Sequence, residues 1–455
     1  MWLALSGAGD GLETQLPAAP GGFVESAADA TIRPVPNALQ IAAFLPTTRS
    51  SFTFPAPYGT QAYRLTLPDD CGGQDCVTSV GYSYWRNINN HRGSNTILIV
   101  ITLDRDKGGG GPTLFSIDKR TGSVTKIGPL FDPADALSFE TGEGWYFSGT
   151  APSILYHKDQ TRLVRLDVLT KTSSTVFDIG TATGLFGSPR LVWQTHSSQD
   201  DHVHSFTVRV DDGDNYEAIG CGVYLETRSE FRFYPRTLAE FGAFDECQID
   251  KSGRWLVIKE QIDGRFGNDN RIIDLETNAE TQLLDENGAP GHSDTGFGYF
   301  VGEDDWNDAA NAMRLWRFGT SPLGPGTVVA SWPTWDADGH LSHSNALNAD
   351  PAKQYACWSG ANRLNGPRTN EISCWVLDGS RRPLVVAPVM VDLDAPGGGD
   401  DYSKMPKGNL DVTGQYFIWT SNMGSSRQDA FVVRVPAQLL DLPPVSPPTN
   451  LRIVR

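Results

Sequence analysis

The chain has 455 residues, and its 37 basic and 54 acidic side chains give a formal net charge of −17 at pH 7. Hydrophobic residues make up 39% of it, which is enough for a substantial core and argues against global disorder. A chain this acidic repels a phosphate backbone, so we expect no nucleic-acid partner. We also expect no transmembrane segment, because no apolar run approaches the roughly 20 residues that a spanning helix needs.

The first nine residues are largely apolar and look like the tail of a secretion signal, although no basic segment precedes them. Near the other end, residues 442–448 are rich in proline and indicate an extended spacer. The last few residues resemble the first strand of a fibronectin type III module. We therefore expect a protein that is secreted, periplasmic or attached to the cell surface.

The six cysteines fall into three candidate pairs. One pair brackets a flexible Gly-Gly-Gln-Asp stretch, a second lies on what look like consecutive strands, and the third pair is what remains. The predicted disulfides are Cys71–Cys76, Cys357–Cys374 and Cys221–Cys247, and they require an oxidising compartment. The alternative is a cytosolic protein with buried free thiols.

Short apolar strands that end near an Asp or another turn residue recur along the chain and give seven candidate hairpins. A second unit, an Asp followed by a tight turn and an aromatic residue five positions later, precedes several of them. It begins at Asp250, Asp294, Asp350 and Asp411, at spacings of 44, 56 and 61 residues. Asp bonds its own backbone and Gly accepts positive φ, so both residue types suit the turn.

This pattern predicts an all-β fold, a seven-bladed β-propeller with blades that begin near residues 79, 143, 190, 244, 291, 341 and 404. The last hairpin lacks an outer strand, and we expect an N-terminal strand from residues 51–54 or 63–66 to close the ring. The predicted domains are an N-terminal extension (1–37), the propeller (38–436) and a Pro-rich linker that begins a fibronectin-like module (437–455).

The Asp-turn-aromatic units and the closing run at residues 414–422 resemble the bacterial propellers built from TolB-type repeats. That group includes the polysaccharide lyases that cleave oligogalacturonate and ulvan. The resemblance covers about residues 79–435 and is more specific for the fold than for the activity.

Three histidines, His196, His292 and His343, each lie near the start of a different expected blade, where first strands line a central channel. Converging imidazoles could bind a divalent metal, and acidic loops such as residues 392–394 and 400–401 add calcium to manganese and zinc as the expected ions. The resemblance implies a channel metal held by His and Gln, for which Gln194 is the candidate. The alternative is that each histidine satisfies a local turn.

A lyase that acts on a uronic acid needs a group that neutralises the carboxylate, a base and an acid. We expect His196 or His343 to act as the base. The candidates for the acid are Tyr402, Tyr299 and Tyr146, of which we expect Tyr402, and those for the neutralising cation are Arg86 and Arg190, of which we expect Arg86. Aromatic, amide and basic residues mix in the segment 82–92, a combination that suits a sugar-binding surface; the alternative is a loop of blade 1 whose polar groups are satisfied within the protein. The expected substrate-binding residues are Trp85, Asn87, Asn90, His91 and Lys407.

Two functions are consistent with these patterns. The first is a secreted carbohydrate-active propeller, a polysaccharide lyase that cleaves a uronate-containing glycan by β-elimination. The second is a non-catalytic extracellular propeller that binds a glycan or a protein, because many propellers are rigid platforms without chemistry. In both cases the expected partner is a polysaccharide or a surface glycan.

Overall fold

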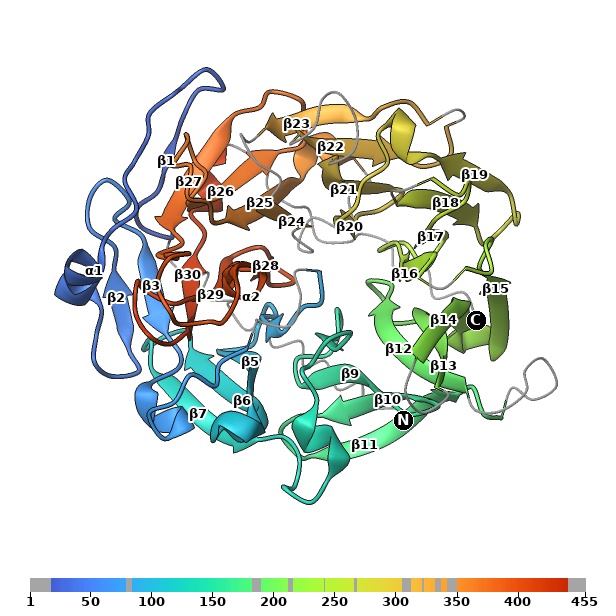
Figure 1. The fold of residues 1–455 in the computed structure, drawn as a ribbon, viewed down its shortest axis with the longest axis horizontal. Helices are drawn as coiled ribbons and strands as arrows, with labels where there is room; N and C mark the ends of the chain where they lie inside the picture. Colours follow the sequence, from blue (N-terminus) through green and yellow to red (C-terminus); the bar gives the residue numbers. More distant parts are fainter. Residues whose placement is uncertain are drawn as a thin grey trace, which may run out of the picture.

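The computed structural model describes residues 18–440 except 79–83, 182–189, 212–215, 241, 266–267, 305–311, 321–322, 332–336 and 342–349. Seven antiparallel sheets stand side by side in a closed ring, and the first strand of each sheet lies nearest the centre (Figure 1). The predicted all-β, seven-bladed propeller is confirmed. No helix in the described ranges is long and apolar enough to cross a membrane.

The strands follow the chain order from the ring centre outward. Blade 1 contains β4 (Ile88–Asn89), β5 (Thr96–Leu103), β6 (Gly111–Asp118) and β7 (Val124–Pro129); blade 2 contains β8 (Tyr146–Phe147), β9 (Ile154–Asp159), β10 (Arg162–Asp167) and β11 (Thr172–Asp178). Blade 3 contains β12 (Arg190–Ser197), β13 (Val203–Asp211), β14 (Tyr216–Leu225) and β15 (Glu230–Pro235); blade 4 contains β16 (Phe244–Ile249), β17 (Trp255–Glu260), β18 (Asp269–Asp274) and β19 (Glu280–Leu283).

Blade 5 contains β20 (Ser293–Thr295), β21 (Tyr299–Asp304), β22 (Ala312–Arg317) and β23 (Thr327–Ser331). Blade 6 contains β24 (Ala337–Leu341), β25 (Tyr355–Gly360), β26 (Glu371–Val376), β27 (Pro383–Pro388) and, outermost, β1 (Phe23–Val24); blade 7 contains β28 (Asn409–Leu410), β29 (Tyr416–Ser421), β30 (Asp429–Arg434), β3 (Gln61–Arg64) and β2 (Ser51–Thr53). The two short α-helices are α1 (Ala38–Phe44) and α2 (Asp401–Lys404). Blades 3 and 4 begin at the predicted residues 190 and 244, whereas blade 1 begins at residue 88 rather than 79.

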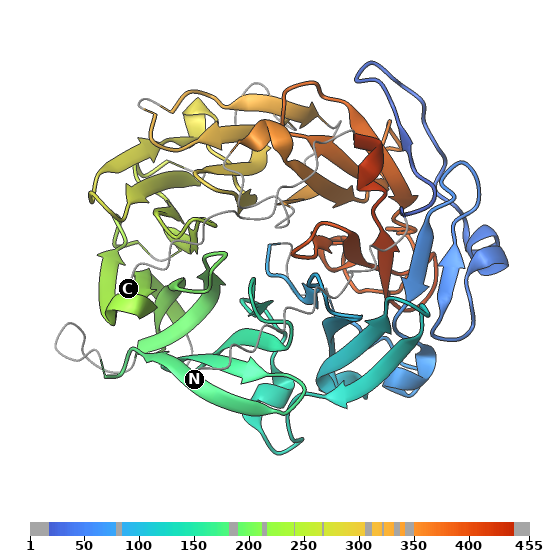
Figure 2. The ribbon, with the colours of Figure 1, turned by 180° about the vertical axis from the view of Figure 1, so that it is seen from behind.

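The outer strands of blades 6 and 7 come from the start of the chain, from a segment that we call the N-terminal strap (residues 18–66). Its strand β3 pairs antiparallel with β30, with Tyr63 opposite Val432, and β1, which lies inside the predicted extension 1–37, pairs with β27. Figure 2 shows the strap lying along the outside of these two blades. The strap therefore supplies outer strands to the sheets of both blade 6 and blade 7.

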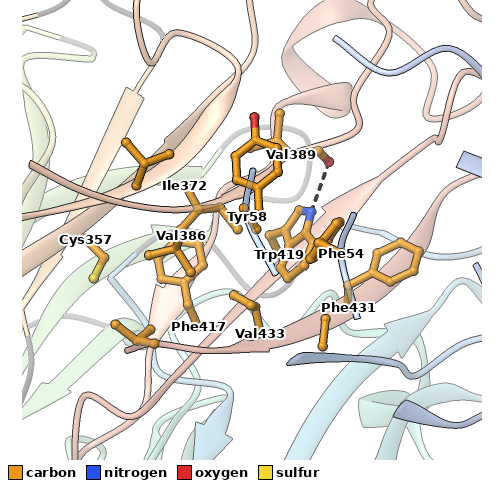
Figure 3. Packing of buried hydrophobic residues seen from close by; sticks show 14 of the residues in the cluster. Phe54, Tyr58, Cys357, Ile372, Val386, Val389, Phe417, Trp419, Phe431 and Val433 are labelled. Carbon is orange, nitrogen blue, oxygen red and sulfur yellow. Dashed lines mark hydrogen bonds between the residues drawn. The ribbon is translucent and has the colours of Figure 1, made fainter. Parts of the chain in front are cut away.

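A buried ionic network and a large apolar cluster hold the strap in place. Arg33 bonds to both Glu25 and Glu371, and the Tyr58 hydroxyl donates to Glu371 at 2.5 Å. Figure 3 shows Phe54 and Tyr58 of the strap packed among residues of blades 6 and 7, where the Trp419 indole donates to the Val389 carbonyl at 3.0 Å. The junction is thus a continuous core rather than a surface contact.

The Asp of the repeated turn explains why the unit recurs. The Asp250 carboxylate accepts from the backbone N–H of Trp255 at 2.9 Å and from that of Gly298, in the next blade, at 2.8 Å. The Asp411 carboxylate likewise accepts from the backbone N–H of Tyr416, at 2.5 Å. One buried carboxylate therefore fixes the turn after an inner strand, and at Asp250 it also joins two blades.

The three predicted disulfides are confirmed. Cys221 of β14 pairs with Cys247 of β16 and links blade 3 to blade 4. The other two are local: Cys357 and Cys374 lie directly opposite each other on β25 and β26, and Cys71–Cys76 closes the loop that precedes blade 1.

Candidate functional site at the centre of the ring

Polar and charged residues gather where inner strands begin, at what we call the start end of the ring centre. Glu143 precedes β8, and its carboxylate accepts from the Gln194 amide at 3.4 Å, while the Thr207 hydroxyl donates to the other atom of that amide at 3.0 Å. Gln194 lies at a bulge of β12 and has a positive φ of 44°. Burial raises the pKa of Glu143.

Asp245 and Glu246 lie side by side at a bulge near the start of β16. Asp245 lies on the inner strand β16 and is exposed to solvent, within electrostatic range of Glu143 and His292. Desolvation by the surrounding wall and then the negative charge of Glu246 raise the pKa of Asp245 to about 6, and the same carboxyl interacts electrostatically with His292. Asp245 is therefore a carboxylic acid that titrates close to neutral pH.

Glu246 is fully buried and forms an ion pair with the equally buried Lys259, whose ammonium donates to Oε1 at 2.6 Å. Burial alone would raise the pKa of Glu246, but the charge of Lys259 lowers it to about 2. The second oxygen, Oε2, has no hydrogen-bond partner and lies 3.9 Å from His196 Nε2. One buried carboxylate oxygen at the ring centre thus remains unsatisfied.

The segment that leads into blade 1 reaches across the ring centre to His196. The Trp85 indole donates to His196 Nε2 at 3.0 Å, and the Tyr84 ring lies 5.9 Å from the imidazole. The ammonium of Lys259, in blade 4, lies 4.9 Å from the centre of the Tyr84 ring. Because Nε2 accepts from the indole, the neutral imidazole carries its proton on Nδ1.

The predicted metal ligands are in part brought together. His196 and Gln194 both lie on β12, and His292, which precedes β20, interacts electrostatically with Asp245. His343 lies outside the described residues. Sequence reasoning missed Glu143, Asp245 and Glu246, although an Asp-Glu pair inside an apolar strand is itself an unusual signal.

Most of the predicted substrate-binding residues are buried and bonded within the protein. Trp85, Asn87 and Asn90 are 1%, 5% and 1% exposed. The Asn87 amide donates to the Val100 carbonyl at 2.9 Å, and the Lys119 ammonium donates to Asn90 at 2.9 Å. A sugar would reach these side chains only after the segment moves.

The remaining predicted residues lie elsewhere. Lys407 and Tyr402 form a pair before β28, where the Lys407 ammonium donates to the Tyr402 carbonyl at 2.8 Å and lies 3.6 Å from the ring centre of that tyrosine. Arg86 is 7% exposed and donates to the Phe147 carbonyl at 3.2 Å. His91 is half-buried, and burial lowers its pKa.

The acidic loops that suggested calcium contain basic partners. Arg363 bonds to both Asp394 and Asp401. On the outer part of blade 4, the carboxylates of Asp263, Asp285 and Glu286 have oxygens within 4.8 Å of one another, the spacing of a metal site, but Arg265 pairs with the first and the last of them.

Comparison with known proteins places this arrangement in a wider group. No family model matches the chain, and no curated protein matches its sequence. Among solved structures, an oligogalacturonate lyase in complex with manganese is similar with a TM-score of 0.58 and 13% sequence identity, over 87% of this chain and 98% of that one. An oligogalacturonate lyase from Vibrio parahaemolyticus is similar with a TM-score of 0.54 and 11% identity, over 92% of this chain and all of that one. TolB from Acinetobacter baumannii matches with a TM-score of 0.37 and 11% identity, over 64% of this chain and 63% of that one. At these identities, the two lyases establish the fold that the repeats had indicated: this chain is a propeller of the architecture that the oligogalacturonate lyases share.

Proposed function

We propose that the chain is a secreted carbohydrate-active propeller, a polysaccharide lyase that cleaves a uronate-containing glycan by β-elimination. The observation that carries the proposal is Asp245, a solvent-exposed carboxyl at the ring centre whose pKa is raised to about 6. A base whose pKa lies near the working pH is deprotonated in a large fraction of the molecules and still accepts a proton readily. Removal of the C5 proton of a uronate requires both properties. The fold likeness to two oligogalacturonate lyases supports this class of substrate.

In this proposal Asp245 is the base and His196 holds its surroundings in place. The sequence had suggested His196 or His343 as the base, but His196 Nε2 already accepts from Trp85. Glu246 keeps its negative charge beside Asp245 because Lys259 pairs with it, and this charge keeps the pKa of Asp245 high. The buried pair thus tunes the base without touching the substrate.

The start end also suits a divalent metal, which one of the similar lyases binds as manganese. An unsatisfied buried oxygen of Glu246 and the donor atoms of Gln194 and His292 fit such an ion, with His343 as a further proposed ligand, and Asp245 is left as the base beside it. When bound, the metal would neutralise the uronate carboxylate as a Lewis acid. A cation would also relieve the repulsion between the carboxylates of Asp245, Glu246 and Glu143.

The second candidate function is a non-catalytic platform that binds a glycan or a protein. The observation that favours it is the burial of Trp85, Asn87 and Asn90, which leaves the segment that crosses the ring centre closed to a sugar. The net charge of −17 also opposes an anionic polysaccharide unless a cation is bound. The three disulfides fit either function in the periplasm or outside the cell.

A panel of uronate polysaccharides, incubated with the protein and manganese, tests the proposal through the ultraviolet absorbance of the unsaturated product. We expect product from at least one member, and a rate that falls as the pH is lowered because Asp245 becomes protonated. Asp245→Asn should abolish activity, whereas Asp378→Asn, at an exposed turn of blade 6, should not. Glycan binding without any product would instead support the platform.

A further inference from the structure

Lys251 is a buried lysine at the opposite end of the ring centre, which we call the turn end because inner strands finish there at the Asp turns. It follows Asp250 directly after β16 and is 3% exposed. Its backbone N–H donates to the Gly296 carbonyl at 2.9 Å, and its own carbonyl accepts from Gln199 at 3.0 Å. Blades 3 and 5 therefore fix its backbone from both sides.

The ammonium of Lys251 has no hydrogen-bond partner. Two other charged side chains, Arg86 and Asp294, lie within electrostatic range of it, in addition to Asp250. Arg86 precedes β4, and both its backbone and its side chain bond to Phe147 of β8 in blade 2. The two cations therefore reach the same region from different blades.

The carboxylates around these cations are largely committed to the backbone. Asp250 accepts from Arg254, Trp255 and Gly298. Asp201 accepts from the backbone N–H of Gly149 and of Thr150, and Asp411 from that of Thr413 and of Tyr416. The remaining carboxylate, Asp294, interacts with both Arg86 and Lys251 without a hydrogen bond to the Lys251 ammonium. His91 and Tyr146 are further titratable groups near Arg86.

A buried ammonium without an acceptor is costly, because three N–H donors lose water and gain nothing in return. Proteins meet this cost by neutralising the group or by supplying an anion. We propose that Lys251, together with Arg86, binds a compact anion of the size of chloride or formate at the turn end. Burial lowers the pKa of Lys251 to about 8, so the ammonium is available at neutral pH and is lost above it.

This anion site is separate from the proposed metal site. Asp245 is the second residue of β16 and Lys251 follows the last one by two positions, so the four steps of about 3.3 Å from Asp245 to Ile249 alone span about 13 Å. The two regions also differ in which group lacks a partner, a carboxylate oxygen of Glu246 at the start end and the ammonium of Lys251 at the turn end. The inference therefore does not depend on the proposed function.

Thermal unfolding of the full chain tests the proposal when bulky gluconate is replaced by chloride or by formate at constant ionic strength. We expect the melting temperature to rise by at least about 2 °C in one of the two small anions at pH 7. The rise should disappear as the pH increases through about 8, because Lys251 loses its charge. Lys251→Met should abolish the rise, and in gluconate it should melt no lower than the wild type because an uncompensated charge has been removed.

Lys158→Met is the matched control, since Lys158 is also buried but its ammonium donates to Glu140 at 2.7 Å. This variant should keep the full response to the small anion. An equal response in Lys251→Met and the wild type, or no response in the wild type, overturns the proposal and leaves a water molecule as the partner of Lys251. If Lys251→Met does not fold, the linewidth of the chloride NMR signal in the presence of the wild-type protein tests the same site. Broadening at pH 7 that disappears at pH 9 supports a site built on Lys251, and broadening that persists at pH 9 contradicts it.

Discussion

The ion pair between Glu246 and Lys259 makes a sharp prediction about stability. Both side chains are fully buried, and their charged atoms lie 2.6 Å apart. Lys259→Met removes the cation and leaves a carboxylate in the protein interior, with the Gln248 amide as its remaining hydrogen-bond donor. Breaking one side of such a pair costs about 3–5 kcal/mol, so we expect the free energy of unfolding to fall by that amount.

Urea unfolding of the disulfide-intact protein at pH 7 measures the effect. Lys126→Met serves as the comparison, because Lys126 is 28% exposed in its side chain and its partner Asp70 keeps Arg49; the expected loss there is about 1 kcal/mol or less. Adding Glu246→Gln to Lys259→Met should recover most of the stability, since no charge is then stranded. The reasoning is refuted if Lys259→Met costs no more than Lys126→Met, or if the double variant recovers nothing.

Three further predictions follow from the turns, the disulfides and the start end. Replacing Cys221 and Cys247 by Ala removes a disulfide that closes a loop with a sequence separation of 26 residues, and it should lower the free energy of unfolding by about 3–4 kcal/mol. Non-reducing peptide mapping should find this disulfide in the wild type. Asp411→Ala should speed amide hydrogen exchange in the turn of blade 7, because the buried carboxylate that bonds to the backbone of this turn is lost. Asp378→Ala, at an exposed turn, should leave exchange unchanged beyond its own turn. Equal effects of the two variants would contradict the role given to the buried carboxylate. Asp245→Asn should stabilise the protein at pH 8 but not at pH 4. The folded-state pKa near 6 exceeds the unfolded value of 3.8, so ionisation of Asp245 lowers the free energy of unfolding only as the pH rises from about 4 to above 6. A gain of equal size at both pH values would contradict this assignment.

The ring could be predicted from the sequence because its repeats report local chemistry. The Asp at position 250 serves a turn whose backbone donors lie within five residues, so the same pattern recurs wherever that turn recurs. The strands of the hairpins are short apolar runs separated by turn residues, and this pattern is also set by residues that are close in the sequence. The pairing of β3 with β30 joins residues more than 360 positions apart, for example Arg64 with Asp429, and only the missing outer strand of the last hairpin indicated it.

The ring centre was harder to predict, because its chemistry depends on which inner strands face one another. The histidines at 196 and 292 could be placed near blade starts, but the bulges that orient Gln194 and Asp245 leave no clear mark in the sequence. The segment around Trp85 has the composition of a sugar-binding surface, yet the indole is buried against an imidazole. Composition reports polarity and aromaticity, whereas exposure is decided by the tertiary fold.

The N-terminal strap also has a consequence for the order of events during synthesis. The strap is made before the blades, and its partner strand β30 is made more than 360 residues later, so the ring cannot close until all seven blades have been made. Until then the strands of the strap have no partners, β1 until β27 is made and β3 until β30 is made. Contacts so distant in sequence close slowly, and exposed strand edges favour association with other chains in the meantime. For this chain, delayed ring closure is therefore the step at which a holding chaperone would have the largest effect on yield.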